Sequence, residues 1–378
     1  MSPFGLASLA WPLIGPPSSR LPASPADAFC QAMLPQTSRT FALSIEALPD
    51  DLARAVRVAY LMCRTVDTIE DDVSLPWPER SDLFEEFAAL LDDDRRDAAA
   101  FEADSQRLAP CADAVLCRNA TAIFQCFREL PASTRGCIRP HVGEMTRGMR
   151  EYAARAARDG RLVLVDVDDL ERYCYHVAGT VGKLLTALFL EEVPLGAERR
   201  RRVTSRAVSF GLGLQLVNIV KDVATDASRS TCFVPRELAA THGVTLERLL
   251  DPALRSRARA VIASLCALAR THLHAAQEYT LAWPAREGLE VRRFCAVPLA
   301  LALASLDEVE YGADTLRPGH TPKVGRATVL ATLVASALAV DSDVRLRALF
   351  AAAGGRHALH HTIGSLAGAQ RDVVGRRA

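Results

Sequence analysis

The 378-residue chain lacks several features that would assign it to a common class. Lys plus Arg and Asp plus Glu both number 45, so the formal net charge is zero and no general positive field is available for a nucleic-acid backbone. The ten cysteines form no C-x-x-C pair, and a chain this long needs no disulfides. We therefore expect reduced thiols, a cytoplasmic location and no nucleic-acid partner.

Long apolar segments are also missing. The longest nearly apolar run, Ala327 to Val340, is shorter than the roughly 20 residues that a membrane-spanning helix needs, so we expect a core helix there. The apolar patch from Phe4 to Ile14 has no basic residue before it and is crowded by prolines, which argues against a secretory signal. We expect contact with a membrane to be peripheral at most.

In the remaining sequence, the residues that interrupt secondary structure are spaced as in an all-helical protein. Aromatic residues are only 6%, and alternating runs of Val, Ile and Thr are scarce. Pro and Gly instead separate long periodic stretches, at 75–78, 130–131, 193–196 and 317–322. These patterns predict an all-α, single-domain helical bundle around a deep central cavity. We assign it to 28–350, with a flexible extension at 1–27 and a tail at 351–378.

The first chemical signal is a cluster of carboxylates. On a helix, Asp67, Glu70 and Asp71 stand at i, i+3 and i+4 and therefore share one face. Their mutual repulsion has to be offset by positive charge, and hard oxygen ligands in this arrangement suit Mg²⁺, which is usually shared with substrate phosphates. A solvated acidic helix face is the alternative.

A second polar stripe lies further along the chain. Gln215, Asn218, Asp222 and Asp226 follow one another at three- and four-residue steps along an otherwise apolar helix. A helix that is apolar on its other faces is buried, and a buried carboxylate persists only when it is paired or bound to a metal. Two such helices facing each other would hold Mg²⁺ ions around a diphosphate, although partner helices and water could also satisfy the stripe.

Six motifs in order carry a resemblance to a known family. They are 38–41 (SRTF), 60–72 (YLMCRTVDTIEDD), 173–182 (YCYHVAGTVG), 215–226 (QLVNIVKDVATD), 233–237 (FVPRE) and 294–298 (FCAVP). Over about 28–345 the chain resembles the squalene and phytoene synthases. The resemblance implies an isoprenoid-synthase fold that joins two prenyl diphosphates head to head through a cyclopropyl intermediate.

The resemblance also implies roles for individual residues. Mg²⁺ ligands on the two walls would be Asp67, Glu70 and Asp71, and Asn218, Asp222 and Asp226. Residues that bind substrate would be Ser38, Arg39, Phe41, Tyr60, Arg64, Gln215 and Lys221. Tyr173 would open a helix, steer the first carbocation and accept the proton lost on ring closure, and Phe294 would line the cation's path. Ion pairs at the surface and ordinary core packing are the alternatives for these side chains.

The product is less closely specified. The segments 67–72 and 294–298 resemble squalene synthases, which convert two farnesyl diphosphates to squalene with NADPH. Thr180 and Tyr175 are closer to phytoene synthases, whereas Thr225, Lys221 and the order of Tyr175 and His176 depart from the squalene pattern. We expect a monomeric squalene-type prenyltransferase that uses Mg²⁺ and NADPH. A phytoene- or diapophytoene-type synthase, acting on farnesyl or geranylgeranyl diphosphate without reduction, and a non-catalytic isoprenoid-binding module stay open.

Overall fold

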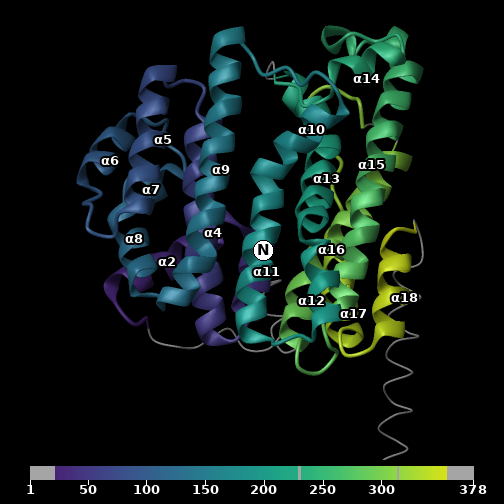
Figure 1. Ribbon diagram of the computed structural model, residues 1–378. Coiled ribbons are helices and arrows are strands. Elements are labelled where there is room, and N and C mark those ends of the chain that lie inside the picture. The colour runs from purple at the N-terminus through teal and green to yellow at the C-terminus, as the bar shows by residue number, and fades with distance from the viewer. Residues whose placement is uncertain (1–21, 229–230, 313–314, 356–378) are drawn as a thin grey trace, which may run out of the picture. The chain divides into compact units, whose positions relative to one another are not determined.

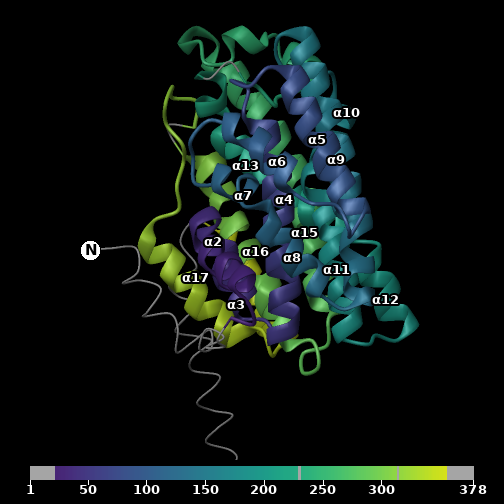
Figure 2. The same cartoon turned by 90° about the vertical axis from the view of Figure 1, so that its left-hand side faces the viewer.

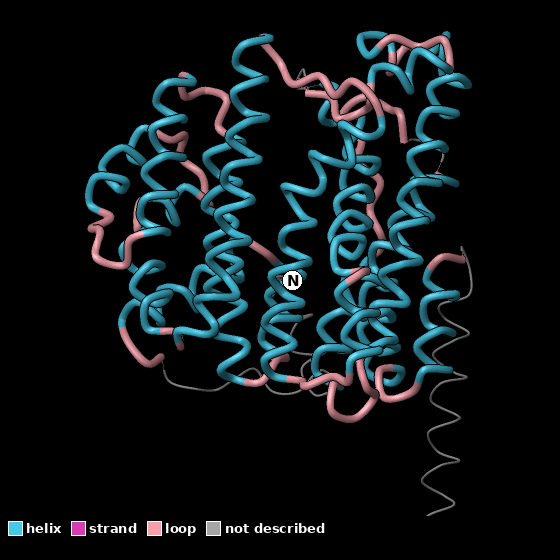
Figure 3. The backbone as a smooth tube through the Cα atoms, viewed as in Figure 1, coloured by secondary structure: helices cyan, strands magenta, loops and turns pink. Residues whose placement is uncertain are grey.

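The computed structural model describes residues 22–228, 231–312 and 315–355, without the side chains of Arg39, Thr40 and Ser228. Within these residues the regular structure is helical and no strand is formed, which confirms the all-α prediction (Figure 3). The described residues before Leu195 form one compact unit, here the N-terminal unit, and those from Leu195 onward form the C-terminal unit.

The N-terminal unit is a set of helices joined by short loops. Its α-helices are α2 (Pro25–Thr37), α3 (Arg39–Glu46), α4 (Asp50–Asp71), α5 (Trp77–Asp92), α6 (Ala99–Asp104), α7 (Ala114–Cys117), α8 (Ala120–Glu129), α9 (Ala132–Asp159), α10 (Val167–Cys174) and α11 (Thr180–Glu192). A 3₁₀ turn, η1 (Ser105–Arg107), follows α6, and a π-helical turn, η2 (Tyr175–Gly179), joins α10 to α11.

Proline and serine set the starts of several of these helices. Pro49, Pro76 and Pro131 directly precede α4, α5 and α9, in agreement with the predicted breaks near 75–78 and 130–131. The Ser24 hydroxyl accepts a hydrogen bond from the Asp27 amide and caps α2. Ordered helix therefore begins three residues before the predicted boundary at residue 28.

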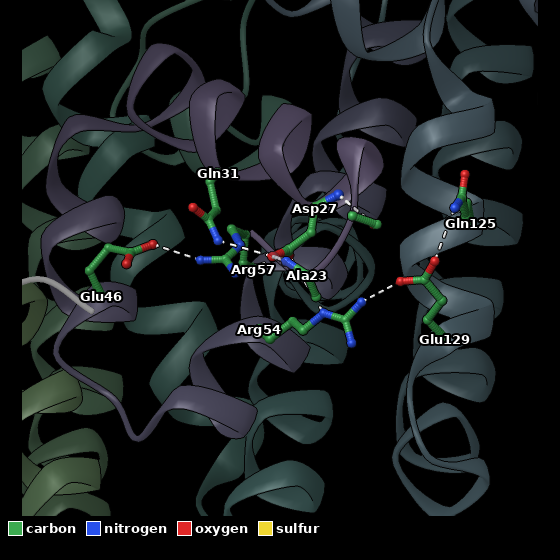
Figure 4. A network of polar contacts seen from close by, with 9 residues as sticks. Ala23, Asp27, Gln31, Glu46, Arg54, Arg57, Gln125 and Glu129 are labelled. Carbon is green, nitrogen blue, oxygen red and sulfur yellow. Dashed lines mark hydrogen bonds and ion pairs between the residues drawn. The ribbon is translucent and has the colours of Figure 1, made fainter. Parts of the chain in front are cut away.

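The helix α4 lies at the middle of this unit, where it packs against α9, α11 and α2 (Figures 1 and 2). Its contact with α2 includes a buried ion pair: Asp27 Oδ1 lies 3.3 Å from Arg57 Nη2, and both side chains are 4% exposed. Arg57 also donates to Glu46 of α3, and Arg54 pairs with Glu129 of α8 (Figure 4). This network fixes α2, α3 and α8 around α4.

The C-terminal unit is built around the long helices that follow residue 206. Its α-helices are α12 (Ala197–Thr204), α13 (Ala207–Ser228), α14 (Arg236–Thr241), α15 (Arg255–Ala282), α16 (Leu289–Tyr311), α17 (Arg326–Ala339) and α18 (Asp343–Ala353), with 3₁₀ turns η3 (Leu246–Arg248) and η4 (Pro252–Leu254). The helices α13 and α15 pack extensively against each other, and Gly213 leaves room for Leu273 between them: an added Cβ would lie 3.0 Å from Leu273 Cδ2.

One stretch of this unit, Ala197–Ala227, is long and apolar enough to cross a membrane, and 61% of its apolar window is buried inside the protein. Core helices of soluble proteins have the same composition, so the observation is weak support for a membrane span. The predicted longest apolar run, Ala327 to Val340, forms α17. It buries Leu333 against Val297 of α16, as expected for a core helix.

Candidate active site

The predicted acidic motif forms the last turn of α4. Val66 and Ile69 on this turn are fully buried, so packing sets the rotation of the helix and places Asp67 and Glu70 at a partly open position. Asp71, the last residue of α4, is exposed. The structure therefore brings the three carboxylates together as the i, i+3, i+4 spacing predicts.

A single arginine serves this cluster from the same helix. Arg64 Nη1 lies 3.5 Å from Asp67 Oδ2, and Arg64 Nη2 lies 2.6 Å from Asp113 Oδ2. Asp67 Oδ1 is buried and accepts no hydrogen bond from the side chains and backbone that the structure describes, so within that part of the chain half of this carboxylate is unsatisfied. Arg64 is the predicted diphosphate ligand, and Asp113 holds its guanidinium toward the acidic cluster.

The carboxylates raise one another's pKa values. Burial, opposed by Arg64 and increased by Asp71, raises the pKa of Asp67 to about 7. Burial and the neighbouring charges of Asp71 and Asp67 raise the pKa of Glu70 to about 8, and its carboxyl group hydrogen-bonds Asp71. Burial also raises the pKa of Asp71, although that residue touches solvent and Arg64 opposes the shift. The cluster therefore holds protons that a bound cation would displace.

Arg80 of α5 lies beneath the same turn. Its side chain is buried, and it donates to the Ile69 carbonyl (3.1 Å) and the Glu70 carbonyl (2.8 Å), which are orphan acceptors at the end of α4. Its charge also opposes the rise in the pKa of Glu70. Arg80 thus fixes the helix end that carries the carboxylates.

The donor set fits Mg²⁺. It contains hard carboxylate oxygens, an orphaned buried oxygen on Asp67 and too little positive charge to balance three acids. Among residues 22–228, 231–312 and 315–355, however, no group of three or more His, Cys, Asp or Glu side chains is arranged so that it could hold a metal ion. Mg²⁺ at this turn would therefore take most of its ligands from water and substrate phosphates.

Tyr173 belongs to the same unit and lies within electrostatic range of this cluster. It is 4% exposed, and burial together with the charges of Glu70, Asp71 and Asp67 raises its pKa well above the usual value. The prediction that Tyr173 opens a helix is wrong: it is the next-to-last residue of α10. A π-helical turn follows it and separates α10 from α11, the helix that carries Gly182.

The predicted substrate-binding residues of the first motif lie at the start of α3, next to Tyr60 of α4. Ser38 caps this helix by accepting a hydrogen bond from the Phe41 amide at 3.1 Å. The Phe41 and Tyr60 rings are 6.2 Å apart, and the Tyr60 hydroxyl donates to the Thr37 carbonyl. Arg39 begins α3, but its side chain lies outside the described part of the chain.

The second stripe lies along α13 as predicted. Leu216, Val217 and Val220 are buried, whereas the stripe itself is open: Asn218 is exposed, and Gln215, Asp222 and Asp226 are half-buried. Lys221 Nζ lies 3.3 Å from Asp222 Oδ2 and 3.5 Å from Asn218 Oδ1. The α13 stripe therefore contains its own positively charged side chain, that of Lys221. That it faces the α4 cluster stays a prediction.

Two further motif residues are in the C-terminal unit. Phe294 of α16 is 1% exposed, so its ring is part of a packed core. Thr225, which departs from the squalene pattern, hydrogen-bonds Thr321 through the two hydroxyl groups at 2.7 Å. An experiment on Phe294 therefore has to separate a role in core packing from a role in the reaction.

Several residues that support the site could not be identified from the sequence alone. These residues are Arg80, Asp113, Glu144, Tyr152 and Asp169. Their contacts join residues that are between 10 and 49 positions apart in the chain, so no local spacing identifies them. Arg80 in particular looks like any surface arginine on an amphipathic helix until its carbonyl partners are seen.

The sequence matches the family model described as squalene/phytoene synthase over residues 34–328. Among characterised relatives, squalene synthase of Schizosaccharomyces pombe is 28% identical over 79% of this chain and 63% of its own length. Squalene synthase 1 of Arabidopsis thaliana is 28% identical over 81% and 72%, and squalene synthase of Bos taurus is 29% identical over 77% and 67%. The chain thus spans about two thirds of the length of these relatives.

Solved structures share the fold at lower identity. TcSQS with the ligand E5700 has a TM-score of 0.73 at 23% identity, covering 90% of this chain and 96% of that one. A dehydrosqualene synthase has a TM-score of 0.54 at 20% identity, covering 81% and 93%. The family match, the helical fold and the acidic turn with Tyr173 beside it lead to one conclusion: the chain belongs to the squalene/phytoene synthase family, a family of prenyltransferases.

Proposed function

We propose that this protein joins two farnesyl diphosphates head to head to presqualene diphosphate and then reduces that intermediate to squalene with NADPH. The observation that carries the proposal is the α4 cluster, three carboxylates with raised pKa values within electrostatic range of a buried tyrosine. The names of the relatives in Schizosaccharomyces pombe and Bos taurus add support for squalene over other products.

Asp67, Glu70 and Asp71 would hold Mg²⁺ in the N-terminal unit, and Asn218, Asp222 and Asp226 would hold it in the C-terminal unit. When bound, Mg²⁺ neutralises negative charge on a departing diphosphate. Arg64 supplies two donors to diphosphate oxygens, and Asp113 keeps its guanidinium aimed at the cluster. Lys221 adds a point charge beside Asp222.

Tyr173 acts as a neutral phenol in this scheme. Its pKa is raised by burial and by Glu70, Asp71 and Asp67, so it keeps its proton at neutral pH. A neutral hydroxyl accepts the proton lost on cyclopropane closure only if it passes its own proton onward. Because Glu70 and Asp71 would be occupied by Mg²⁺ in this scheme, the released diphosphate held beside them is the base that would take this proton.

Incubation with farnesyl diphosphate and Mg²⁺, with and without NADPH, tests the proposal when products are identified by mass spectrometry. We expect squalene with NADPH, and presqualene diphosphate without it. Tyr173→Phe should lose nearly all consumption of farnesyl diphosphate. Phe294→Ala should still form the cyclopropyl diphosphate but release alcohols from water capture instead of squalene. A folded wild-type protein that consumes no prenyl diphosphate would leave the binding-module alternative.

A phytoene-type reaction without reduction is the second candidate. It is favoured by the order Tyr175-His176 and by Thr180, whose hydroxyl donates to the His176 carbonyl at 2.8 Å. Formation of a polyene by wild type, with no NADPH consumed, would replace the squalene assignment. Comparing farnesyl with geranylgeranyl diphosphate in the same assay identifies the chain length.

We further propose a monomer in the cytoplasm that touches the membrane only peripherally, since the product is insoluble in water. High-salt and carbonate washing of membranes should release the protein. Retention in the washed pellet would show that the stretch Ala197–Ala227 spans the membrane instead of serving as a core helix.

A further inference from the structure

Three residues of α9 form one stripe that contacts the segment around Tyr173. Glu144, Gly148 and Tyr152 stand at i, i+4 and i+8 and therefore lie on one face of the helix. Along this stripe they meet, in order, Tyr175, His176 and Tyr173. None of the six sequence motifs includes these three residues of α9. Their contacts reach residues before and after the start of the π-helical turn.

Tyr152 packs directly against Tyr173. The ring centroids are 5.2 Å apart with an interplanar angle of 76°, an edge-to-face contact. The Tyr152 hydroxyl donates to Asp169 Oδ1 at 3.0 Å, and Asp169 stands one helical turn before Tyr173 on α10. One residue thus fixes both the ring of Tyr173 and the helix that carries it.

Asp169 is itself firmly held. Its side chain is 4% exposed and accepts hydrogen bonds from Arg155 Nη1 and the Val165 amide, each at 2.9 Å. Burial alone would raise the pKa of Asp169, but the hydrogen bond from Arg155 and those from Val165 and Tyr152 lower it to about 2. The carboxylate therefore stays ionised and anchors Tyr152 across the neutral pH range.

The next two contacts hold the π-helical turn. His176 lies so close over Gly148 that a Cβ added there would be 2.1 Å from His176 Cγ. The Glu144 carboxylate accepts from the Tyr175 hydroxyl at 2.6 Å and from Lys183 Nζ at 2.9 Å, and Lys183 also donates to Tyr175 at 2.9 Å. These contacts tie α9 to η2 and to α11.

A π-helical turn is less favourable than continuous α-helix and persists when its surroundings fix it. Here it changes the register between Tyr173 and α11. We propose that the α9 stripe positions Tyr173 for reaction, with Tyr152 and Asp169 as positioning residues that act on its ring and on α10. The proposal rests on the proposed function in giving Tyr173 a role in turnover.

Steady-state kinetics of Tyr152→Leu, with farnesyl diphosphate and Mg²⁺, tests this role. Removing the ring should lower kcat by about 10- to 100-fold while KM changes little, because substrate still binds and Tyr173 is misplaced. Tyr152→Phe keeps the ring contact but loses the hydrogen bond to Asp169, so its kcat should lie between those of wild type and Tyr152→Leu. Phe101→Leu is the matched control: it removes a fully buried ring that packs against Phe87 in the same unit.

The control separates positioning from general loss of stability. We expect Phe101→Leu to lower Tm as much as Tyr152→Leu does while leaving kcat within about twofold of wild type. Equal kcat losses in the two Leu variants, or a Tyr152→Phe variant as slow as Tyr152→Leu, would overturn the proposal.

A second readout needs no turnover. In protein with ring-labelled [¹³C]tyrosine, six tyrosine signals are expected, and Tyr173→Phe identifies the one from Tyr173. This signal should be single and sharp in wild type and in Tyr152→Phe, and should broaden or split in Tyr152→Leu. A single sharp signal in Tyr152→Leu would mean that Tyr173 is held without Tyr152. If wild type consumes no prenyl diphosphate, only the proposed function is contradicted. The signal of labelled Tyr173 still shows whether Tyr152 holds its ring in place.

Discussion

The two acidic stripes of this protein differ in how their charge is balanced. On α4, the carboxylates of Asp67, Glu70 and Asp71 lie near two arginines that are also engaged elsewhere. The shorter contact of Arg64 goes to Asp113, and Arg80 donates to backbone carbonyls. On α13, Asp222 has its own cation, because Lys221 lies 3.3 Å away. Burial and mutual repulsion raise the pKa values of the α4 carboxylates, while the α13 stripe is partly neutralised within its own helix.

This difference indicates that the two stripes contribute unequally to the binding of metal and diphosphate. The α4 cluster is under electrostatic strain in the absence of a cation, so it gains most when Mg²⁺ binds. The α13 stripe gains less, because a cation there competes with Lys221. We therefore expect α4 to dominate the affinity for metal and diphosphate, and the following predictions separate the two stripes by activity and by stability.

The largest effect is expected from Asp67→Asn. Loss of the carboxylate whose Oδ1 is orphaned should reduce turnover by about 10³-fold or more, since charge on the leaving diphosphate is no longer offset. The folded protein should be as stable as wild type or more stable, because repulsion is relieved. Steady-state rates and thermal melts without Mg²⁺ measure both. Asp104→Asn, an exposed acid paired with Arg107, is the control and should change neither.

Asp222→Asn should also lower turnover strongly, by about 10²- to 10³-fold. Its effect on stability should have the opposite sign to that of Asp67→Asn, because Lys221 loses its partner. The expected loss is small, below about 1 kcal/mol, since both side chains are partly exposed. If Asp222→Asn stabilises the metal-free protein as much as Asp67→Asn does, the two stripes are not electrostatically different.

The pH dependence of stability provides a third comparison. The pKa of Asp67 rises from 3.8 to about 7, and that of Glu70 from 4.5 to about 8. An acid whose pKa is higher in the folded state favours folding below its unfolded pKa, and this contribution is lost as the pH rises through the folded pKa. Metal-free wild type should therefore lose stability between about pH 4 and pH 8 relative to Asp67→Asn and Glu70→Gln.

Chemical denaturation at several pH values measures this difference directly. Adding Mg²⁺ with inorganic diphosphate at pH 8 should restore the stability of wild type more than that of either variant. Parallel pH profiles for wild type and both variants would show that these carboxylates do not titrate in the expected range.

The smallest effect on turnover is expected from Arg80→Met. The substitution leaves the Ile69 and Glu70 carbonyls without their donor and should cost about 1–3 kcal/mol of stability. It also removes a charge that opposes the rise in the pKa of Glu70, so turnover should fall at acidic pH more than at pH 8. Rates across the pH range test this, and a uniform decrease would mean that Arg80 acts only on the helix end.

Local spacing was enough to predict the parts of the site that lie on one helix. Asp67, Glu70 and Asp71 follow the 3.6-residue period of α4, and the α13 stripe follows the same rule from Gln215 to Asp226. Helix starts after Pro76 and Pro131 were also readable, because proline fits the first turn and disfavours a helix before it.

The remaining features depend on contacts between distant residues. Tyr173 was placed at the wrong end of a helix because the π-helical turn at Tyr175–Gly179 has no clear sequence period. Its support, through Tyr152 and Asp169, joins residues on α9 and α10 that only tertiary packing brings together. The division of the described chain into two units falls at the predicted Pro/Gly break at 193–196, but nothing in the composition distinguishes that break from the other breaks between helices.

Calorimetric titration of metal-free protein with Mg²⁺ in the presence of inorganic diphosphate tests the central claim, that the α4 turn is the principal cation and diphosphate site. Wild type should bind with a heat that Asp67→Asn removes and that Asp222→Asn only weakens. Equal binding by wild type and Asp67→Asn would contradict the account.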